Sequence, residues 1–325
     1  MKIASGLACL ALTLIAVAVP AAAQQAYPAR PIRLVVPYPP GGATDPQARM
    51  LATKLAEKWG QQILVDNRGG GNTVIGTEMV AKSPPDGYTL LWVAPAFVTT
   101  PSLLPKLPYD NVRDFAAVAT ISRTRYVLVL HPSVPANNLQ ELIALAKAKP
   151  GQLNYASSGV GTAPHLSGEL FNLVAGVKLQ HIPYKGSGQL IPDLIAGQVQ
   201  LSFQGVISVI SHIKSGKLRA IAVGGENRVP ALPQVPTFAE AGLPAYDRKD
   251  SWHGIVAPAG TPQAIIDKLS TEIARILAAP EAQENLANQG LDPFISTPGE
   301  TAALIKVDIA RIATIIRAAN IRVEN

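Results

Sequence analysis

Residues 32–59 read IRLVVPYPPGGATDPQARMLATKLAEKW, and their pattern predicts a strand, a loop and a helix in that order. Branched apolar residues at 32–36 predict a strand, and the apolar spacing over 46–59 predicts an amphipathic helix. In the loop between them, Gly41 and Gly42 let backbone amides approach a ligand. Asp45 before a proline predicts a helix N-cap. Helix N-termini bind anions, so this loop is a candidate anion site, with a purely structural Asp45 as the alternative.

The same order of strand, loop and helix recurs at residues 154–171, NYASSGVGTAPHLSGELF. Ser157, Ser158 and Thr162 offer hydroxyl groups, Gly161 exposes its amide, and Thr162 is the predicted cap of the following helix. Open α/β sheets place ligands at such loops. If each of two domains carries one of these loops, the two loops would hold a carboxylate-bearing solute between the domains.

Three further side chains are candidates for ligand contact. His165 lies in the first turn of the second helix, where local packing is the more common role for a histidine. Tyr184 lies in the loop HIPYKGSG, and Gln204 ends a predicted strand. Ser157 with His165 has neither a G-x-S-x-G elbow nor a nearby acidic partner, so no catalytic residue and no enzyme activity is predicted.

Alternating strands and helices predict an α/β protein with largely parallel sheets. The length favours two domains. We expect residues 24–125 and 251–325 to form one lobe, and residues 126–250 to form the other. Further strands are predicted at 90–93, 126–130, 153–156, 177–182, 199–203, 218–223 and 255–257, and further helices at 141–148, 164–174, 189–196, 206–213, 261–278 and 298–318.

Composition excludes several classes of protein. Apolar residues make up 48% of the chain and charged residues 15%, which is unlike a disordered protein. The net charge of +6 is scattered without a basic block, so no nucleic-acid partner is expected. The histidines lack metal-binding spacing and no glycine-rich nucleotide motif is complete, so neither a metal nor a cofactor is expected.

Residues 1–23 have the pattern of a secretory signal peptide. Lys2 precedes an apolar run over residues 3–19, and Ala21 to Ala23 suit signal peptidase. The alternative is a membrane anchor, but the run is short for a span and Pro20 closes it. Cleavage would remove Lys2 and the single cysteine, Cys9, and would lower the net charge from +6 to +5. We therefore expect export to the periplasm.

Taken together, the motifs resemble those of the solute-binding proteins of tripartite tricarboxylate transporters, often called the Bug family. The resemblance covers nearly the whole chain after residue 23, and the order and spacing of the motifs make it specific. The motifs are PYPPGGATDPQAR at 37–49, PPDGYTL at 84–90, RDFAAVA at 113–119, PGQLNYASSGVGTAPHLSGELF at 150–171, HIPYKGSG at 181–188, PQVPTFAEAGLP at 233–244 and WHGIVAPAGTP at 252–262.

This resemblance implies a type II periplasmic-binding-protein fold, in which two α/β lobes joined by crossing strands close on a ligand. It implies a small carboxylate as ligand, integral membrane transporter subunits as partner, and a protein that we expect to be a monomer. The implied contacts lie on Tyr38, Gly41, Gly42, Ala43, Thr44, Asp45, Pro95 and Ala96 in the first lobe, and on Ser157, Ser158, Gly161, Thr162, His165 and Tyr184 in the second.

One position departs from the family pattern. The family usually carries an acidic residue where this chain has Gln204, and a neutral amide cannot pair with an ammonium group as a carboxylate does. We therefore expect simple mono- or dicarboxylates rather than amino acids. Two alternatives remain open at this point: a ligand-sensing module for a membrane sensor kinase, and a periplasmic enzyme acting on a carboxylate or ester.

Overall fold

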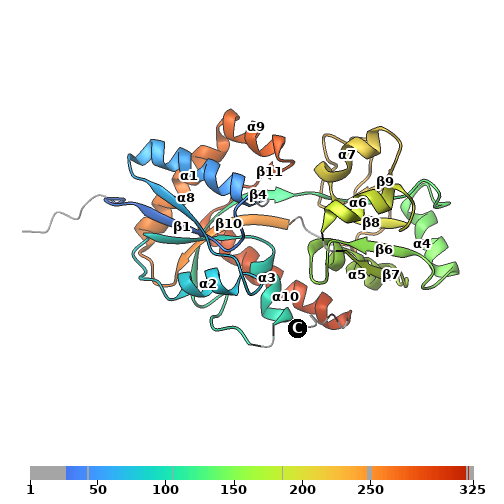
Figure 1. The fold of residues 1–325 in the computed structure, drawn as a ribbon, viewed down its shortest axis with the longest axis horizontal. Coiled ribbons are helices and arrows are strands. Elements are labelled where there is room, and N and C mark those ends of the chain that lie inside the picture. The colour runs from blue at the N-terminus through green and yellow to red at the C-terminus, as the bar shows by residue number, and fades with distance from the viewer. Residues whose placement is uncertain are drawn as a thin grey trace, which may run out of the picture.

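The computed structural model describes residues 27–41, 44–104, 106–184, 186–246, 251–319 and 321. They form two α/β lobes, each built on its own sheet (Figure 1). The predicted signal peptide lies outside the described residues. Within them, no helix has both the length and the apolar character needed to cross a membrane.

Lobe 1 is built on a six-stranded sheet in the order β11-β4-β10-β3-β1-β2. β1, β2 and β3 are parallel, whereas β10 runs antiparallel to both of its neighbours, β3 and β4. The prediction of largely parallel sheets is wrong here, because β4 carries the chain toward lobe 2 and β10 brings it back beside β4. The strands are β1 Ile32–Val36, β2 Ile63–Asn67, β3 Thr89–Val93, β4 Phe115–Thr124, β10 Ser251–Pro258 and β11 Asp292–Pro293.

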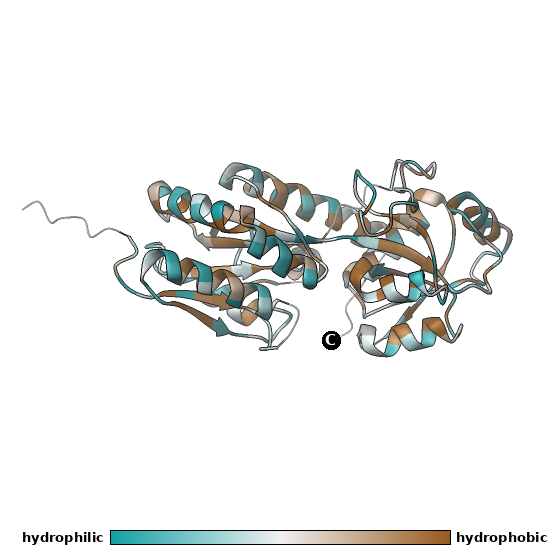
Figure 2. Ribbon diagram, turned by 90° about the horizontal axis from the view of Figure 1, so that it is seen from above, coloured by the Kyte–Doolittle hydropathy of each residue, from teal (hydrophilic) through white to brown (hydrophobic). Residues whose placement is uncertain are grey.

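Helices cover both faces of this sheet (Figure 1). Ile32 and Leu34 pack toward α1 and α8, while Val35, which follows Leu34, belongs to the core on the opposite face. This alternation follows from the period of two along a strand. The apolar strands therefore lie between helices whose polar sides face outward (Figure 2). The helices are α1 Asp45–Trp59, α8 Gln263–Ala278 and α9 Pro280–Asn288 on one face, and α2 Val74–Ala81, α3 Ala96–Leu103 and α10 Pro298–Ala318 on the other.

Lobe 2 is built on a five-stranded sheet in the order β7-β6-β8-β5-β9. β6, β7 and β8 are parallel, and β5 runs antiparallel to β8 and β9. Val127 and Val129 face one core and Leu128 and Leu130 the other, so both faces of β5 are buried. The elements are β5 Tyr126–Leu130, α4 Leu139–Ala148, β6 Asn154–Ser157, α5 Ala163–Ala175, β7 Gln180–Pro183, α6 Ser187–Ile195, β8 Leu201–Gly205, α7 Val206–Lys214 and β9 Arg219–Val223.

Arg125 lies where the chain crosses between the lobes, after β4 and before β5. Its side chain is buried, and its guanidinium donates to the Asp292 carboxylate of lobe 1 at 3.0 Å and to the Asn227 backbone oxygen at 3.0 Å. The C-terminal helix α10 of lobe 1 also packs against α5 of lobe 2. The lobes therefore meet through the crossing strands and along α10, and a cleft opens between them.

Candidate ligand-binding cleft

The cleft between the lobes has a volume of about 530 Å³ and is lined from both sides, within the range of small-molecule sites. Gly41 and Pro95 line it from lobe 1, and Ser158 and Gln204 line it from lobe 2. Thr124, Tyr126, Ser251 and His253 of the crossing strands also line it, and we call these four residues the floor. Among the described residues, none that lines this cleft is an aspartate, glutamate, lysine or arginine.

Asp45 holds the first-lobe loop by hydrogen bonds from its carboxylate. The prediction that Asp45 is the N-cap of α1 is wrong, because Thr44 occupies the cap and Asp45 is the first helical residue. The Asp45 carboxylate accepts from the amide of Gly41 at 3.1 Å, from Arg49 Nε at 2.9 Å and from Asn67 Nδ2 at 3.1 Å. These partners, with Arg49 foremost, lower the pKa of Asp45, so its carboxyl group is ionised. The hydrogen bond from the Gly41 amide to this carboxylate fixes Gly41 at the cleft.

Tyr38 and Ala96 connect this loop to the start of α3. The backbone of Ala96 hydrogen-bonds to the Tyr38 hydroxyl, and burial raises the pKa of that hydroxyl. Pro95, the N-cap of α3, lines the cleft beside them. The predicted contacts Gly42 and Ala43 lie outside the described residues.

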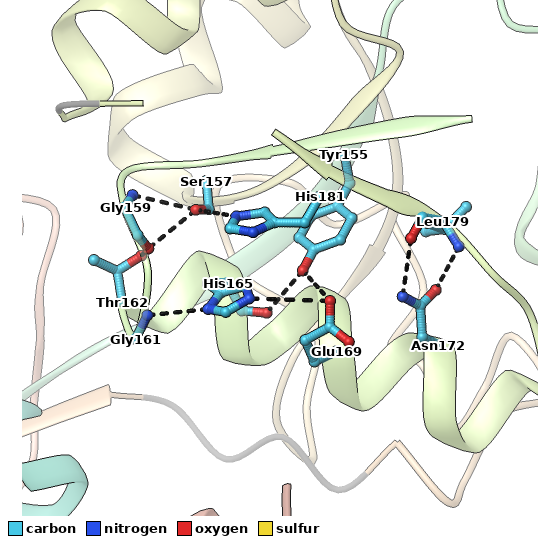
Figure 3. Close-up of polar contacts among 10 residues, drawn as sticks. All are labelled: Tyr155, Ser157, Gly159, Gly161, Thr162, His165, Glu169, Asn172, Leu179 and His181. Atoms are coloured by element: carbon cyan, nitrogen blue, oxygen red, sulfur yellow. Dashed lines mark hydrogen bonds and ion pairs between the residues drawn. The ribbon is translucent and has the colours of Figure 1, made fainter. Parts of the chain in front are cut away.

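Hydrogen bonds within the second-lobe loop fold it onto itself (Figure 3). Ser157 Oγ lies 2.7 Å from His181 Nε2 and accepts from the amide of Gly159 at 3.2 Å. Thr162 stands at the N-cap of α5, but its hydroxyl donates to the oxygen of Gly159 at 2.6 Å rather than capping the helix. Several predicted contacts thus shape the loop, while Ser158 lines the cleft.

His165 and His181 form a stacked pair behind this loop. Their ring centroids lie 3.9 Å apart, and Tyr155 stacks on His181 at 4.9 Å (Figure 3). His165 Nδ1 accepts from the amide of Gly161 at 3.0 Å, and its Nε2 lies 4.0 Å from Glu169. Burial lowers the pKa of each histidine to about 4, and for His165 the neighbouring His181 adds to the effect. Both rings are therefore neutral at physiological pH, and for His165 this agrees with Nδ1 accepting from the amide of Gly161.

Tyr184 follows the edge strand β7, and Gln204 lies on β8, the central strand of the second-lobe sheet. The hydroxyl of Tyr184 donates to Asp193 of α6 at 2.8 Å. Gln204 is buried at the end of β8, lines the cleft, and donates from Nε2 to Ser202 Oγ at 2.8 Å. Direct ligand contact by each of the predicted residues stays a prediction.

A buried polar group that includes His253 of the floor was not predicted from the sequence. Ser122 Oγ donates to Gln47 Oε1 at 2.6 Å and lies 3.1 Å from His253 Nδ1. Gln47 and His253 line the cleft, and burial lowers the pKa of His253 to about 4. Polar residues inside buried strands were the available signal, but their meeting depends on the pairing of β4 with β10, which places Ser122 opposite His253. Among the described residues, no group of three or more potential ligands is arranged to hold a metal ion.

Two α/β lobes joined by crossing strands, with a cleft between them, are the architecture of a periplasmic binding protein. The family that the chain matches implies a periplasmic location. The chain belongs to the TctC family, whose description is "Tripartite tricarboxylate transporter family receptor". It matches this family over residues 47–321. It is 42% identical to Protein BugT of Bordetella pertussis, over 90% of each chain. That family is one of solute-binding receptors.

Two solved structures show the likeness in three dimensions. R. palustris Rpa4515 with adipate is 35% identical, with a TM-score of 0.74, over 91% of this chain and 99% of that one. MatC (Rpa3494) from Rhodopseudomonas palustris with bound malate is 29% identical, with a TM-score of 0.70, over 89% of this chain and 100% of that one. The predicted family and two-lobe fold are confirmed.

Proposed function

We propose that this protein captures a small mono- or dicarboxylate in the cleft between its lobes and delivers it to integral membrane transporter subunits. The observation that carries the proposal is the lining of the cleft, which combines a glycine-bearing loop from lobe 1, a loop from lobe 2 and neutral polar side chains. Adipate and malate in the two related structures are carboxylates of this kind. Match to a transporter receptor family favours delivery to a permease over a sensor kinase.

The proposed function depends on movement of the two lobes. Residues 24–125 and 251–325 would move as one body and residues 126–250 as the other, with closure around the acid. In this proposal the protein is a monomeric receptor that performs no reaction, so the ligand leaves it chemically unchanged. Export would depend on the signal peptide at residues 1–23.

Mass spectrometry of material released from the purified protein tests this proposal, followed by a thermal-shift screen of organic acids. We expect a small carboxylic acid, recovered chemically intact, that raises the melting temperature when added back. Release of a chemically altered acid after incubation would point to an enzyme instead. A folded protein that binds no organic acid would contradict the proposal.

Gln204→Glu tests the predicted exclusion of amino acids. A buried carboxylate beside the ligand would repel a simple acid and attract an ammonium group. By calorimetry, we expect the variant to bind simple carboxylates at least about tenfold more weakly and to gain measurable binding of an amino acid. Gln283→Glu on exposed α9 is the matched control. Tight amino-acid binding by the unaltered protein, without binding of simple acids, would refute the exclusion.

A further inference from the structure

Proton positions in the buried group of Ser122, Gln47 and His253 follow from its hydrogen bonds. The Ser122 hydroxyl carries one proton and donates it to Gln47 Oε1 at 2.6 Å. Ser122 Oγ can then only accept from His253, whose Nδ1 lies 3.1 Å away. Nδ1 of His253 is therefore the protonated nitrogen.

The second nitrogen of His253 must be an acceptor. Burial holds the pKa of His253 near 4, so the ring is neutral and carries a single N–H. With that proton on Nδ1, Nε2 presents a lone pair. His253 is 7% exposed and lines the cleft, and within the described part of the chain its Nε2 has no hydrogen-bond partner.

We propose that the floor of the cleft is a subsite for a hydroxyl group of the ligand, accepted by Nε2 of His253, so that the ligand is a hydroxycarboxylate. The inference rests on the proposed capture of a carboxylate and names its class. A hydroxyl donates to the lone pair, whereas the oxygen of a second carboxylate or of a ketone can only face it with another lone pair. The ligand carboxylate lies toward the glycine-bearing loops, and the hydroxyl toward the floor.

The direction of the chain of hydrogen bonds depends on Gln47. In a Gln47→Leu variant the Ser122 hydroxyl loses its acceptor and turns to His253 Nδ1, so the ring proton moves to Nε2. His253 then offers a donor, which suits a ketone oxygen. Gln47 thus sets which ligand group the floor accepts without supplying the accepting atom.

Calorimetry with matched acids tests the subsite. Each set contains a hydroxy acid, the oxo acid with the same carbon skeleton and the unsubstituted acid, for example lactate, pyruvate and propionate, or 3-hydroxybutyrate, acetoacetate and butyrate. We expect the unaltered protein to bind the hydroxy acid about tenfold or more tightly than its oxo partner in the set whose skeleton fits. Gln47→Leu should bring that ratio close to one or reverse it, whereas Gln283→Leu on exposed α9 should preserve it.

The tautomer of His253 gives a second, independent readout. Nitrogen-15 NMR of the ligand-free protein, with the His253→Phe variant used to assign the signals, should show Nδ1 protonated and Nε2 bare. A proton on Nε2 in the unaltered protein would overturn the inference. Equal binding of hydroxy, oxo and unsubstituted acids would overturn it too, yet would leave the proposed function intact. Failure of the folded protein to bind any acid would instead remove the proposed function, and the inference with it.

Discussion

At the scale of single residues, Asp45 shows how a side chain can serve a binding site from behind it. Its carboxylate joins Gly41 at the cleft to Arg49 on the same helix and to Asn67 at the end of β2. The sequence indicated a helix start near this position, but a pattern of residues along one segment could not show a partner on another strand. The contact between Asn67 and Asp45 was therefore not predicted.

Asp45→Ala should reduce both stability and ligand affinity. The change leaves the Gly41 amide and the Asn67 side chain without their charged acceptor, which costs about 2 kcal/mol. We expect a lower midpoint of urea unfolding and weaker carboxylate binding by calorimetry. Asp267→Ala on α8, whose carboxylate accepts only from the exposed Gln263 side chain among the bonds described, is the control. Unchanged affinity would restrict Asp45 to a structural role.

The buried histidines predict how stability depends on pH. His165, His181 and His253 have pKa values lowered from 6.5 to about 4. Between these values the unfolded chain binds more protons than the folded protein, so the free energy of unfolding falls as the pH falls from about 6.5 toward 4. It is fully regained above 6.5.

Urea unfolding at pH 7.5 and at pH 5 measures this loss. His181→Phe keeps an aromatic ring in the stack but removes one of the three titrating groups, so the loss should shrink by about a third. The carboxylates with lowered pKa values titrate below this window. A variant that loses as much stability as the unaltered protein would rule out His181 as one of the groups responsible.

At the scale of elements, agreement between prediction and structure follows local signals. Helix α10 begins and ends at the predicted residues, because Pro298 opens it and Thr297 with Glu300 forms a capping box. Strand β4 was not predicted, because its FAAVATISRT sequence has small residues and little alternation, and its pairing with β10 comes from a segment far along the chain. Helix α3 was also missed, since Pro101 lies inside it.

Gly290, which lies just after α9, approaches Ile207 in the first turn of α7 across the cleft. A Cβ at Gly290 would lie 2.0 Å from the Cβ of Ile207, and Gly290 has a φ of +72°. Figure 1 shows α9 and α7 facing each other from the two lobes. Only a glycine permits this approach of the lobes.

Gly290→Ala should therefore weaken ligand binding by holding the lobes apart. Gly216→Ala is a matched control, since Gly216 has the same φ of +72° and nothing within 4 Å of an added Cβ. Both variants carry a backbone strain of about 1 kcal/mol, but we expect only Gly290→Ala to lower affinity in calorimetry. Equal losses in the two variants would mean that strain alone, and not contact between lobes, is responsible.

As a whole, the molecule consists of two lobes with one cleft between them. The two-lobe α/β fold was predictable, because repeated strand, loop and helix segments carry local signals and the motif order was specific. The cleft was predictable only in part. Gly41, Pro95, Ser158 and Gln204, which were expected to contact the ligand, line the cleft, and their contact with a ligand stays a prediction. The other residues behind and along its floor depend on how β4 and β10 cross.

Closure gives the whole molecule a measurable response. Saturating acid, at about a hundred times its dissociation constant, should add about 2.7 kcal/mol to the free energy of unfolding. Small-angle scattering should show a smaller radius of gyration with the acid than without it. An unchanged radius together with increased stability would favour a preformed cleft over lobe closure.

A crystal structure of the protein with the acid that it releases on denaturation would test directly where the ligand binds. We predict a carboxylate between the lobes, within hydrogen-bonding distance of amides in the loop at Gly41 and in the loop at Ser158. A bound molecule without a carboxylate, or a carboxylate bound outside this cleft, would contradict it.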